Sequence, residues 1–488
     1  MTRKERFLSR REFLKAAGLM TVGAAAAACA PTTPAPTPVP PTATPAAAAP
    51  TTAPTPTVPA IKGGPLEVGV FYEEGPWFDL VKEIGDQLEK DFPGTKVKYT
   101  FANTASDAAR ALRWEGGDPL DVDTAKWNAQ AKVTWSYADN DMLLDLTPYL
   151  EEPLPSGEKW MDIYAPITRS FAVDQRPDSK TSGRWLGVPA EVILMLIHYN
   201  QRAFDEMGVQ PAKTWPEFLE LCATIYEKGK PKGMKPICVS GPTDIYVGHW
   251  WDRMVQRMVG RKEVEKVVFG DGHVRDNPGF LAAAKEIEKI PQNDWLMDGY
   301  EGADFTAAQA MFFQGKAAMI HMGTWLIGEM ADVLPEDFVV GTFDFPTVPE
   351  GKGDQKAMFG TSHIFSVPNP KISKSHEVNV PLAIEYLKRF CGREAAAKRA
   401  QVLGSISPCT KVPSPPRLPG VDKIIEAAGE TELIIYYYGI HWDTALWAAW
   451  YPPVQALFLK KITAEQMIEQ IDENLDKYRA MKAATPTP

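Results

Sequence analysis

The amino-acid sequence predicts an α/β protein with more than one lobe, and three observations point to this class. The chain has 488 residues, which is too long for one ordinary hydrophobic core. Strand patterns alternate with helical patterns from the start of the globular part, near Gly63. Later segments begin with helix-capping motifs and continue with helical apolar spacing.

The first unit of the globular part shows this alternation directly. "LEVGVFYEE" (66–74) predicts a strand, "WFDLVKEIGDQLEKDFPG" (77–94) predicts a helix, and "KVKYTFA" (96–102) predicts a second strand. The apolar residues that share one face of this helix are Leu80, Val81, Ile84, Leu88 and Phe92. A strand–helix–strand unit indicates a parallel sheet.

Three further helices are predicted from capping boxes, in which a threonine is followed three residues later by Glu or Gln. The boxes are Thr214–Glu217, Thr306–Gln309 and Thr463–Gln466. Each is followed by apolar residues at helical spacing, so we expect a helix to begin at each.

Residues 1–28 predict an export signal rather than a folded segment. A basic start leads into the pair Arg10-Arg11, then Phe13-Leu14-Lys15 and an alanine-rich apolar run. This order matches a twin-arginine-type signal peptide. A membrane-spanning helix fits poorly because the apolar run is short and consists largely of alanine.

Cys29 ends the apolar run and is the predicted lipidation site, at the start of a tether over residues 29–62. The sequence before it resembles a bacterial lipobox, although Ala26 stands where leucine is usual. If lipidation fails, the same alanines suit an ordinary signal peptidase and the protein is released. Residues 30–60 contain only Pro, Thr, Ala and Val, with eleven prolines, a composition that behaves as a stiff spacer.

The charge and hydropathy of the mature chain exclude some partners. Residues 1–28 carry six Lys/Arg and two Asp/Glu, so their removal takes the net charge from −10 to −14. An acidic exported domain repels nucleic acid and anionic lipid, so neither is an expected partner. Nothing after Cys29 is long and apolar enough to cross a membrane, and the lipid anchor is the only membrane contact expected.

Four cysteines remain after Cys29, and their state is left open by the sequence. Outside the cytosol, Cys222 can pair with Cys238 and Cys391 with Cys409. The alternative is four buried free thiols, which twin-arginine export of a folded chain slightly favours.

Six segments spread over the mature chain together resemble a known family. They are "DFPGTKVKYTF" (91–101), "GGDPLDVDTAKW" (116–127), "NDMLLDLTPYLEE" (140–152), "RWLGVPAEVILMLIHYNQRAFDEMGVQPAKTWPEFLELC" (184–222), "FFQGKAAMIHMGTW" (312–325) and "ITAEQMIEQIDENLDKY" (462–478). In this order they resemble the family 1 extracellular solute-binding proteins of bacterial ABC importers, of which maltose-binding protein is the best-known member.

The resemblance implies a periplasmic-binding-protein fold with two α/β lobes, joined by hinge segments that cross between them, and a ligand cleft between the lobes. On this sequence, lobe 1 would comprise residues 63–190 and 359–412. Lobe 2 would comprise residues 191–358 and 413–488. The crossings would fall near Ala190 and Phe359.

Trp325 is the leading candidate for a ligand contact. "AAMIHM" predicts a buried strand, Gly323 allows a tight turn, and Trp325 then opens a helix. Ligands of α/β proteins gather at the carboxyl ends of strands, and the flat apolar face of a sugar suits an aromatic ring. The resemblance implies that the tryptophan of this "G.W" motif stacks on sugar. The alternative is a tryptophan packed between domains.

Other candidates lie near predicted strand ends or match family positions. Carboxylates are included because they accept strong hydrogen bonds from neighbouring hydroxyls, and each candidate could equally have a solvated or capping role. Of the aromatic group Tyr246, Trp250 and Trp251, at most two are expected to touch ligand, and the helical spacing around Trp447 also suits a core stripe. The remaining candidates are Glu74, Trp77, Asp121, Lys126, Trp127, Asn128, Glu191, Thr361, His363 and Trp442.

Two other classes of function are alternatives to sugar binding. Asp118, Asp121 and Asp123 could supply the two carboxylates of a glycoside hydrolase, but their spacing fits a strand edge, and no His-Glu-x-x-His, Gly-x-Ser-x-Gly or Walker motif occurs. A polyamine or other organic cation would also suit aromatic rings and carboxylates. Glycerol phosphate is disfavoured because no arginine cluster falls at the predicted strand ends.

The sequence therefore predicts a receptor rather than an enzyme, without cofactor or metal. It would be exported, anchored to the outer face of the cell membrane through Cys29, and monomeric. It would capture a neutral sugar or oligosaccharide and deliver it to the permease of an ABC importer. The 14 tryptophans and the "GTW" motif favour sugar over an organic cation.

Overall fold

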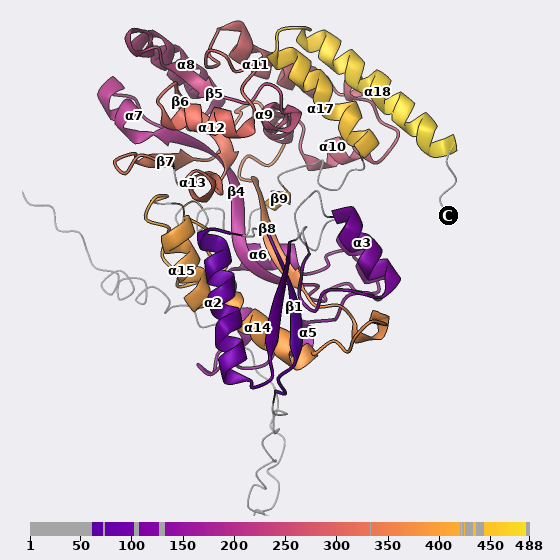
Figure 1. Ribbon diagram of the computed structural model, residues 1–488. Helices are drawn as coiled ribbons and strands as arrows, with labels where there is room; N and C mark the ends of the chain where they lie inside the picture. The colour runs from indigo at the N-terminus through magenta and orange to yellow at the C-terminus, as the bar shows by residue number, and fades with distance from the viewer. Residues whose placement is uncertain are drawn as a thin grey trace, which may run out of the picture. The chain divides into compact units, whose positions relative to one another are not determined.

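In the computed structural model (Figure 1), the described residues all belong to the unit Ala60–Pro488. The residues described are 61–71, 74–101, 107–125, 132–331, 333–419, 421, 424, 433–435 and 444–484. The predicted signal peptide, Cys29 and nearly all of the tether lie outside them and stay predictions.

The first strand–helix–strand unit is confirmed. β1 (Pro65–Val70) and β2 (Lys96–Phe101) pair in parallel, and α2 (Pro76–Asp91) connects them. The buried residues of α2 include Val81, Ile84 and Leu88, as its apolar spacing predicts.

A second, seven-stranded sheet is mixed rather than parallel, which corrects the expectation from the first unit. The antiparallel pairs are β3–β8, β8–β4, β4–β6 and β4–β7, and the parallel pairs are β5–β6 and β8–β9. The strands are β3 (Asp123–Ala125), β4 (Val188–Asn200), β5 (Lys235–Cys238), β6 (Ala317–Gly323), β7 (Val340–Phe343), β8 (Met358–Ser366) and β9 (Leu433–Ile435).

β4 is the central element of this sheet, and it changes partners along its length. Val188–Leu194 pairs with β8, and the following residues, Met195–Tyr199, pair with β6. Figure 1 shows β4 and β8 side by side. Ala190 and Phe359, the predicted crossing positions, lie in these two strands. The lobe boundaries assigned to them stay a prediction.

Helices pack on both sheets in two groups that the contacts identify. α2, α14 and α15 pack together, and α9, α11, α17 and α18 form the other group. Besides α2, the α-helices within the described residues are α3 (Asp107–Gly116), α4 (Lys132–Asp139), α5 (Thr147–Leu150), α6 (Pro166–Ala172), α7 (Gln201–Met207), α8 (Trp215–Gly229), α9 (Asp244–Met258), α10 (Arg261–Val268), α11 (Pro278–Gln292), α12 (Phe305–Phe313), α13 (Leu326–Glu329), α14 (Val380–Phe390), α15 (Arg393–Leu403), α17 (Thr444–Phe458) and α18 (Ala464–Ala484).

Two of the three predicted capping boxes are confirmed. At α8, Thr214 accepts a hydrogen bond from the Glu217 amide and Glu217 accepts in return. At α18, Thr463 and Gln466 exchange the same pair of bonds. The box at Thr306 is wrong, because α12 begins earlier and Asp304 caps it by accepting from the Ala307 amide at 2.8 Å.

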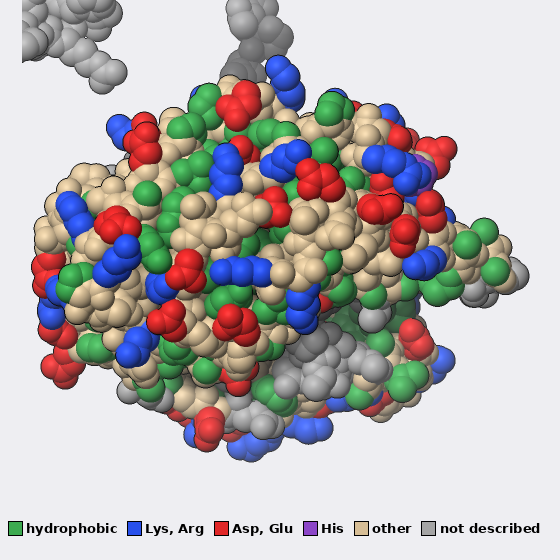
Figure 2. Space-filling model, turned by 90° about the horizontal axis from the view of Figure 1, so that it is seen from above, with side chains coloured by type: hydrophobic (Ala, Val, Ile, Leu, Met, Phe, Trp, Pro, Cys, Tyr) green, Lys and Arg blue, Asp and Glu red, His purple; other side chains and the backbone are tan. Residues whose placement is uncertain are grey.

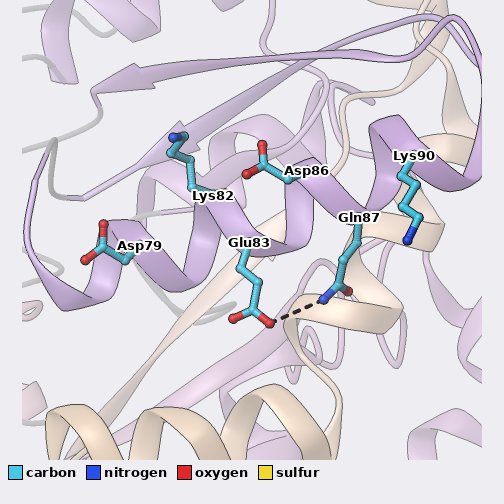
Figure 3. Close-up of a pocket in the computed structure, with 6 residues that line it drawn as sticks. All are labelled: Asp79, Lys82, Glu83, Asp86, Gln87 and Lys90. Carbon is cyan, nitrogen blue, oxygen red and sulfur yellow. Dashed lines mark hydrogen bonds between the residues drawn. The ribbon is translucent and has the colours of Figure 1, made fainter.

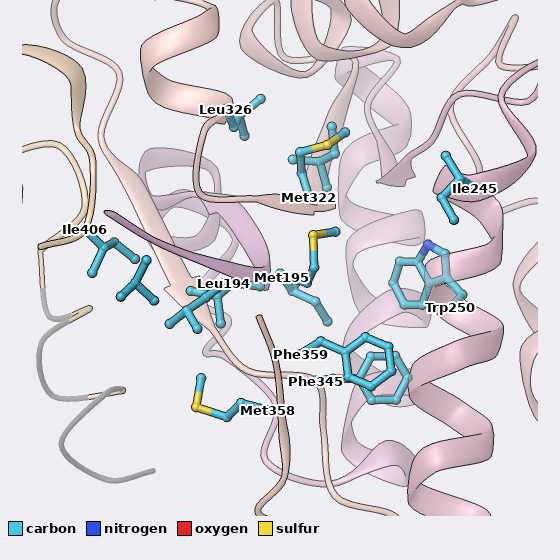
Figure 4. Packing of buried hydrophobic residues seen from close by; sticks show 14 of the residues in the cluster. Leu194, Met195, Ile245, Trp250, Met322, Leu326, Phe345, Met358, Phe359 and Ile406 are labelled. Carbon is cyan, nitrogen blue, oxygen red and sulfur yellow. The ribbon is translucent and has the colours of Figure 1, made fainter. Parts of the chain in front are cut away.

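The hydrophobic core is continuous through the junction at which β4 changes partners. Figure 4 shows Leu194 and Met195 in the middle of this packing, with Ile406 on one side and Trp250 on the other. The cysteines take the free-thiol state: Cys222, Cys238, Cys391 and Cys409 are all buried and unpaired.

The surface carries charges of both signs. On the face shown in Figure 2, acidic and basic side chains are interspersed among apolar ones. An ion pair joins two of the helices, since Lys285 of α11 lies 2.8 Å from Glu465 of α18. Within the described residues, no helix has the length and apolarity needed to cross a membrane.

Candidate functional site

Trp325 lies immediately beyond the carboxyl end of β6, as predicted, and forms the N-cap position of α13. Gly323 is required there, because a Cβ at this position would lie 2.0 Å from the Trp325 ring. The ladder continues past Gly323, since the Thr324 amide donates to the Leu194 carbonyl at 3.0 Å. Trp325 is half-buried, and the turn that carries it is bonded to β4 at Leu194, where β4 changes partners.

Glu191 and His363 meet across the crossing strands. They are directly paired in the β4–β8 ladder, and His363 Nδ1 lies 2.5 Å from Glu191 Oε1. The hydroxyl of Ser405 donates to the other carboxylate oxygen, Oε2, at 2.8 Å. Phe71, just after β1, packs on the His363 ring with centroids 4.2 Å apart. All four residues are partly exposed, so this polar cluster faces solvent.

The charge of Glu191 is stabilised by its neighbours. Burial would raise the pKa of its carboxyl, but the adjacent His363 and the Ser405 hydroxyl, with the charge of Arg399, lower it below its usual value. Glu191 is therefore a carboxylate at neutral pH, and a carboxylate can accept hydrogen bonds from ligand hydroxyls.

Tyr246 and Trp447 form a second aromatic group at the start of α9. Tyr246 stacks on Phe305 at 4.4 Å between ring centroids. The indole N–H of Trp447, on α17, donates to Asp244 Oδ2 at 3.0 Å. Both rings are half-buried, as a ligand-contacting ring must be. That Tyr246, Trp447 and Trp325 contact one ligand stays a prediction.

Trp250 and Trp251, both candidate ligand contacts, lie in the core, so of the group with Tyr246 only Tyr246 is partly exposed. Trp250 is 1% exposed and Trp251 is 0% exposed. Trp250 packs against Phe218, His321 and Phe345. α9 is covered on several sides, so its aromatic residues at successive positions both point into apolar surroundings.

Trp77 and Thr361 are also buried in this structure. The Trp77 ring contacts Phe71 and Phe390 edge-on. Thr361 pairs with Ile193 in the β4–β8 ladder. Their placement gives each a packing role, and neither offers a surface to a ligand in this conformation.

Asp121 has a structural role, which again differs from the expectation. It is buried, it accepts from the Glu67 amide at 2.7 Å, and it lies 3.2 Å from His376 Nε2. Burial raises the pKa of its carboxyl. Asp121 thus joins β1 to the segment that leads into β3.

The neighbouring acids, which the glycosidase alternative requires, are paired as well. Asp118 accepts from Arg113 at 2.9 Å, and Asp123 accepts from the Trp114 indole at 2.7 Å. The bond from Ser375 lowers the pKa of Asp118. These pairings leave no couple of opposed, ligand-facing carboxylates among Asp118, Asp121 and Asp123.

For the remaining candidate ligand residues, the described part of the structure shows no contact with another candidate. Glu74 is exposed just ahead of α2. Lys126, Trp127, Asn128 and Trp442 lie outside the described residues and stay predictions.

Two hollows are lined by none of these candidates. One, of about 370 Å³, is lined only by polar side chains along α2 (Figure 3), where Gln87 donates to Glu83 at 3.3 Å. Another, of about 260 Å³, lies between α7 and the end of α8 and is lined in part by Met207, Lys228 and Met234. Neither hollow is lined by aromatic rings, which a sugar site requires.

Sequence reasoning missed Phe71, Ser405 and Asp244. Phe71 could have been found because it directly follows β1, the same kind of position that predicted Glu74. Ser405 had no local signal, since its partner Glu191 is 214 residues away. Among the described residues, no group of three or more His, Cys, Asp or Glu could hold a metal ion.

The fold and these partly exposed aromatic and acidic residues beside crossing strands define a two-lobed α/β binding protein. The family model for bacterial extracellular solute-binding proteins matches residues 78–371, more than half of the chain. The chain therefore belongs to the bacterial extracellular solute-binding protein family.

Curated proteins with sugar-binding names are similar to this chain in sequence, at low identity and over part of their length. A probable sugar-binding periplasmic protein of Rhizobium meliloti is 27% identical over 198 residues, which are 38% of this chain and 44% of that protein. A multiple sugar-binding protein of Streptococcus mutans is 25% identical over 282 residues, which are 56% of this chain and 60% of that protein. The chain thus spans about half the length of these relatives.

Solved structures share the fold over nearly their whole length. A chitin oligosaccharide binding protein superposes with a TM-score of 0.67 at 20% identity, covering 86% of this chain and 99% of that one. The binding protein RafE in complex with raffinose gives 0.66 at 19% identity, covering 85% and 99%. At these identities the likeness establishes the fold.

Proposed function

We propose that this protein captures a neutral sugar or oligosaccharide and delivers it to the permease of an ABC importer. The observation that carries the proposal is Trp325, a partly exposed ring at the carboxyl end of β6 beside the junction of the crossing strands. Family membership supports it. So do the names of its relatives, which include a multiple sugar-binding protein, and structural neighbours that bind chitin oligosaccharide and raffinose.

The chemistry of the candidate residues suits an uncharged polyol. An indole face covers the axial C–H groups of a sugar, and the carboxylate of Glu191 accepts from its hydroxyls. The same residues can hold an organic cation, so the ligand screen must include amines.

In this proposal the protein works outside the cytosol as a monomer. The export signal at Arg10-Arg11 takes it across the membrane, and a lipid on Cys29 keeps it on the outer face. Replacing Cys29 with Ala should then release the protein from the membrane into the periplasm or the medium, and unchanged retention in the membrane fraction would contradict the anchor.

Ligand capture would proceed by closure about β4 and β8. A ligand that contacts residues on both sides of the crossing stabilises the closed arrangement, and the permease would recognise that arrangement.

One experiment tests ligand class and closure together. The mature domain is screened by thermal shift against neutral oligosaccharides and, in parallel, diamines, because a ligand of the native state raises its melting temperature. Small-angle scattering on each positive mixture then compares the radius of gyration with and without ligand. We expect a sugar to raise the melting temperature and to compact the molecule. A response to diamines alone would contradict the proposed function, and binding without compaction would contradict closure.

A further inference from the structure

The crossing strand β4 contains a bulge where it reaches the candidate site. Its register with β8 shifts between Pro189 and Glu191, so Ala190 is the extra residue. The Ala190 carbonyl accepts from the buried guanidinium of Arg399 at 2.8 Å, and the same guanidinium donates to the Phe390 carbonyl at 2.7 Å. Arg399 of α15 therefore stabilises the bulge, and the bulge sets the orientation of the next residue, Glu191.

The turn after α15 also reaches Glu191 directly. Gly404 ends the helix with a left-handed φ of 69°, and a Cβ there would lie 3.0 Å from Ile327. Ile406 then forms a bridge with Val192 of β4, whose amide donates to the Ile406 carbonyl at 2.9 Å. This bridge places Ser405, between Gly404 and Ile406, beside Glu191.

We propose that Ser405 is a positioning residue for the ligand-binding carboxylate of Glu191, an inference that depends on the proposed function. Its hydroxyl donates to Oε2 while His363 holds Oε1. With one partner on each oxygen, the carboxylate keeps one orientation, and each oxygen retains capacity to accept a further hydrogen bond. A bound hydroxyl then meets an acceptor that is already oriented, so less conformational freedom is lost on binding.

The turn also connects the two candidate contacts. Trp325 opens α13, Ile327 of the same helix packs on Gly404, and Ser405 follows. The chain thus fixes the Trp325 helix and the Glu191 carboxylate against one segment, residues 404–406. The positions of Trp325 and Glu191 are therefore fixed relative to each other through this segment.

The test compares ligand affinity among matched variants of the mature domain. Ser405→Ala removes the donor and Ser405→Thr restores it. The control Ser407→Ala removes a hydroxyl two residues farther on, which donates to the Cys409 carbonyl instead. Calorimetry uses the best-binding oligosaccharide, or a diamine if no sugar binds. We expect S405A to weaken binding about three- to tenfold, and S405T and S407A to bind within about twofold of the parent.

A double-mutant cycle separates positioning from a general structural effect. In a Glu191→Ala background, S405A should leave affinity unchanged, because its effect passes through Glu191. An equal loss in both backgrounds, or no loss from S405A alone, would overturn the proposal. If only a diamine binds, the proposed function fails and the same cycle still decides the role of Ser405.

The contact itself is tested without ligand. S405A and E191A should change the melting temperature non-additively, since the two side chains share a hydrogen bond. Additive changes would overturn the contact on which the positioning role depends, whatever the ligand.

Discussion

At Trp325, a single ring is fixed by the backbone around it. Gly323 leaves the space that the ring occupies, and Thr324 ties the turn to Leu194 of the crossing strand. A ring held in this way would lose little freedom if a ligand stacked on it, so the entropic cost of that contact would be low.

Replacing Trp325 with Ala should weaken ligand binding by about ten- to a hundredfold, since both stacking and apolar burial are lost. Trp325→Phe should retain part of the affinity. The matched control is Phe269→Ala, an aromatic residue that is 54% exposed at the end of α10, which should bind like the parent. Calorimetric titration measures all three variants, and unchanged affinity in W325A would show that the ring is not a ligand contact.

The sequence could predict the placement of Trp325 because its signal is local: a buried strand, a glycine and a helix start. It could not place Trp250 and Trp251, because periodicity shows that a helix has a buried face but not how many sides are covered. Asp121 was misassigned for a related reason. Its partners, Glu67 and His376, come from distant segments, so its burial is a tertiary property.

Among the elements, α9 contacts several others, including α11, α17 and β6. Its first turn holds Tyr246 and the Asp244 that anchors Trp447. Farther along, Arg253 and Arg257 are both buried and share the carboxylate of Asp344, and both donate to the Ala357 carbonyl just ahead of β8. A shift of α9 would therefore move candidate ligand residues and a crossing strand together.

Asp252 attaches α9 to α17 and makes this attachment sensitive to pH. It is fully buried, accepting from the Tyr451 hydroxyl at 2.7 Å and the Trp450 indole at 3.1 Å. Burial raises the pKa of its carboxyl to about 7, against an opposing effect of these two bonds. A raised pKa means that the folded state holds the proton more tightly, so this group's contribution to stability falls as pH rises from about 4 to about 7.

Asp252→Asn should remove this slope, because the amide does not titrate. We expect the melting temperature of D252N relative to the parent to rise between those two pH values, by the equivalent of roughly 1–3 kcal/mol. Thermal melts across the range measure it. Glu301→Gln, which removes an exposed charge, should give an offset that does not change with pH. A flat difference for D252N would mean that Asp252 does not titrate in this range.

Element boundaries were predicted well where capping chemistry is local, as at Thr214 and Thr463. The Thr306 box failed because Asp304, two residues earlier, is also a strong cap and lengthens α12. The antiparallel pairing of β4 could not be predicted from its sequence. Its near-continuous apolar run is typical of any doubly covered strand, whatever the direction of its partners.

On the scale of the whole molecule, β4 and β8 connect the region of β3 to that of β6 and β7 through one continuous sheet. The family was predictable because its six motifs span the chain, and each motif needs only local order. The particular sugar was not, because it depends on which side chains converge, and Glu191 with Ser405 is a contact between distant segments.

The most direct test of the account is calorimetric titration of the mature domain with a neutral oligosaccharide at about 20 mM and about 500 mM salt. Stacking and hydrogen bonding to an uncharged ligand are barely screened, whereas capture of a cation by carboxylates weakens with ionic strength. We predict saturable heat from a sugar with nearly equal affinity at both salt concentrations. No heat from any saccharide, together with salt-sensitive binding of a diamine, would contradict the account.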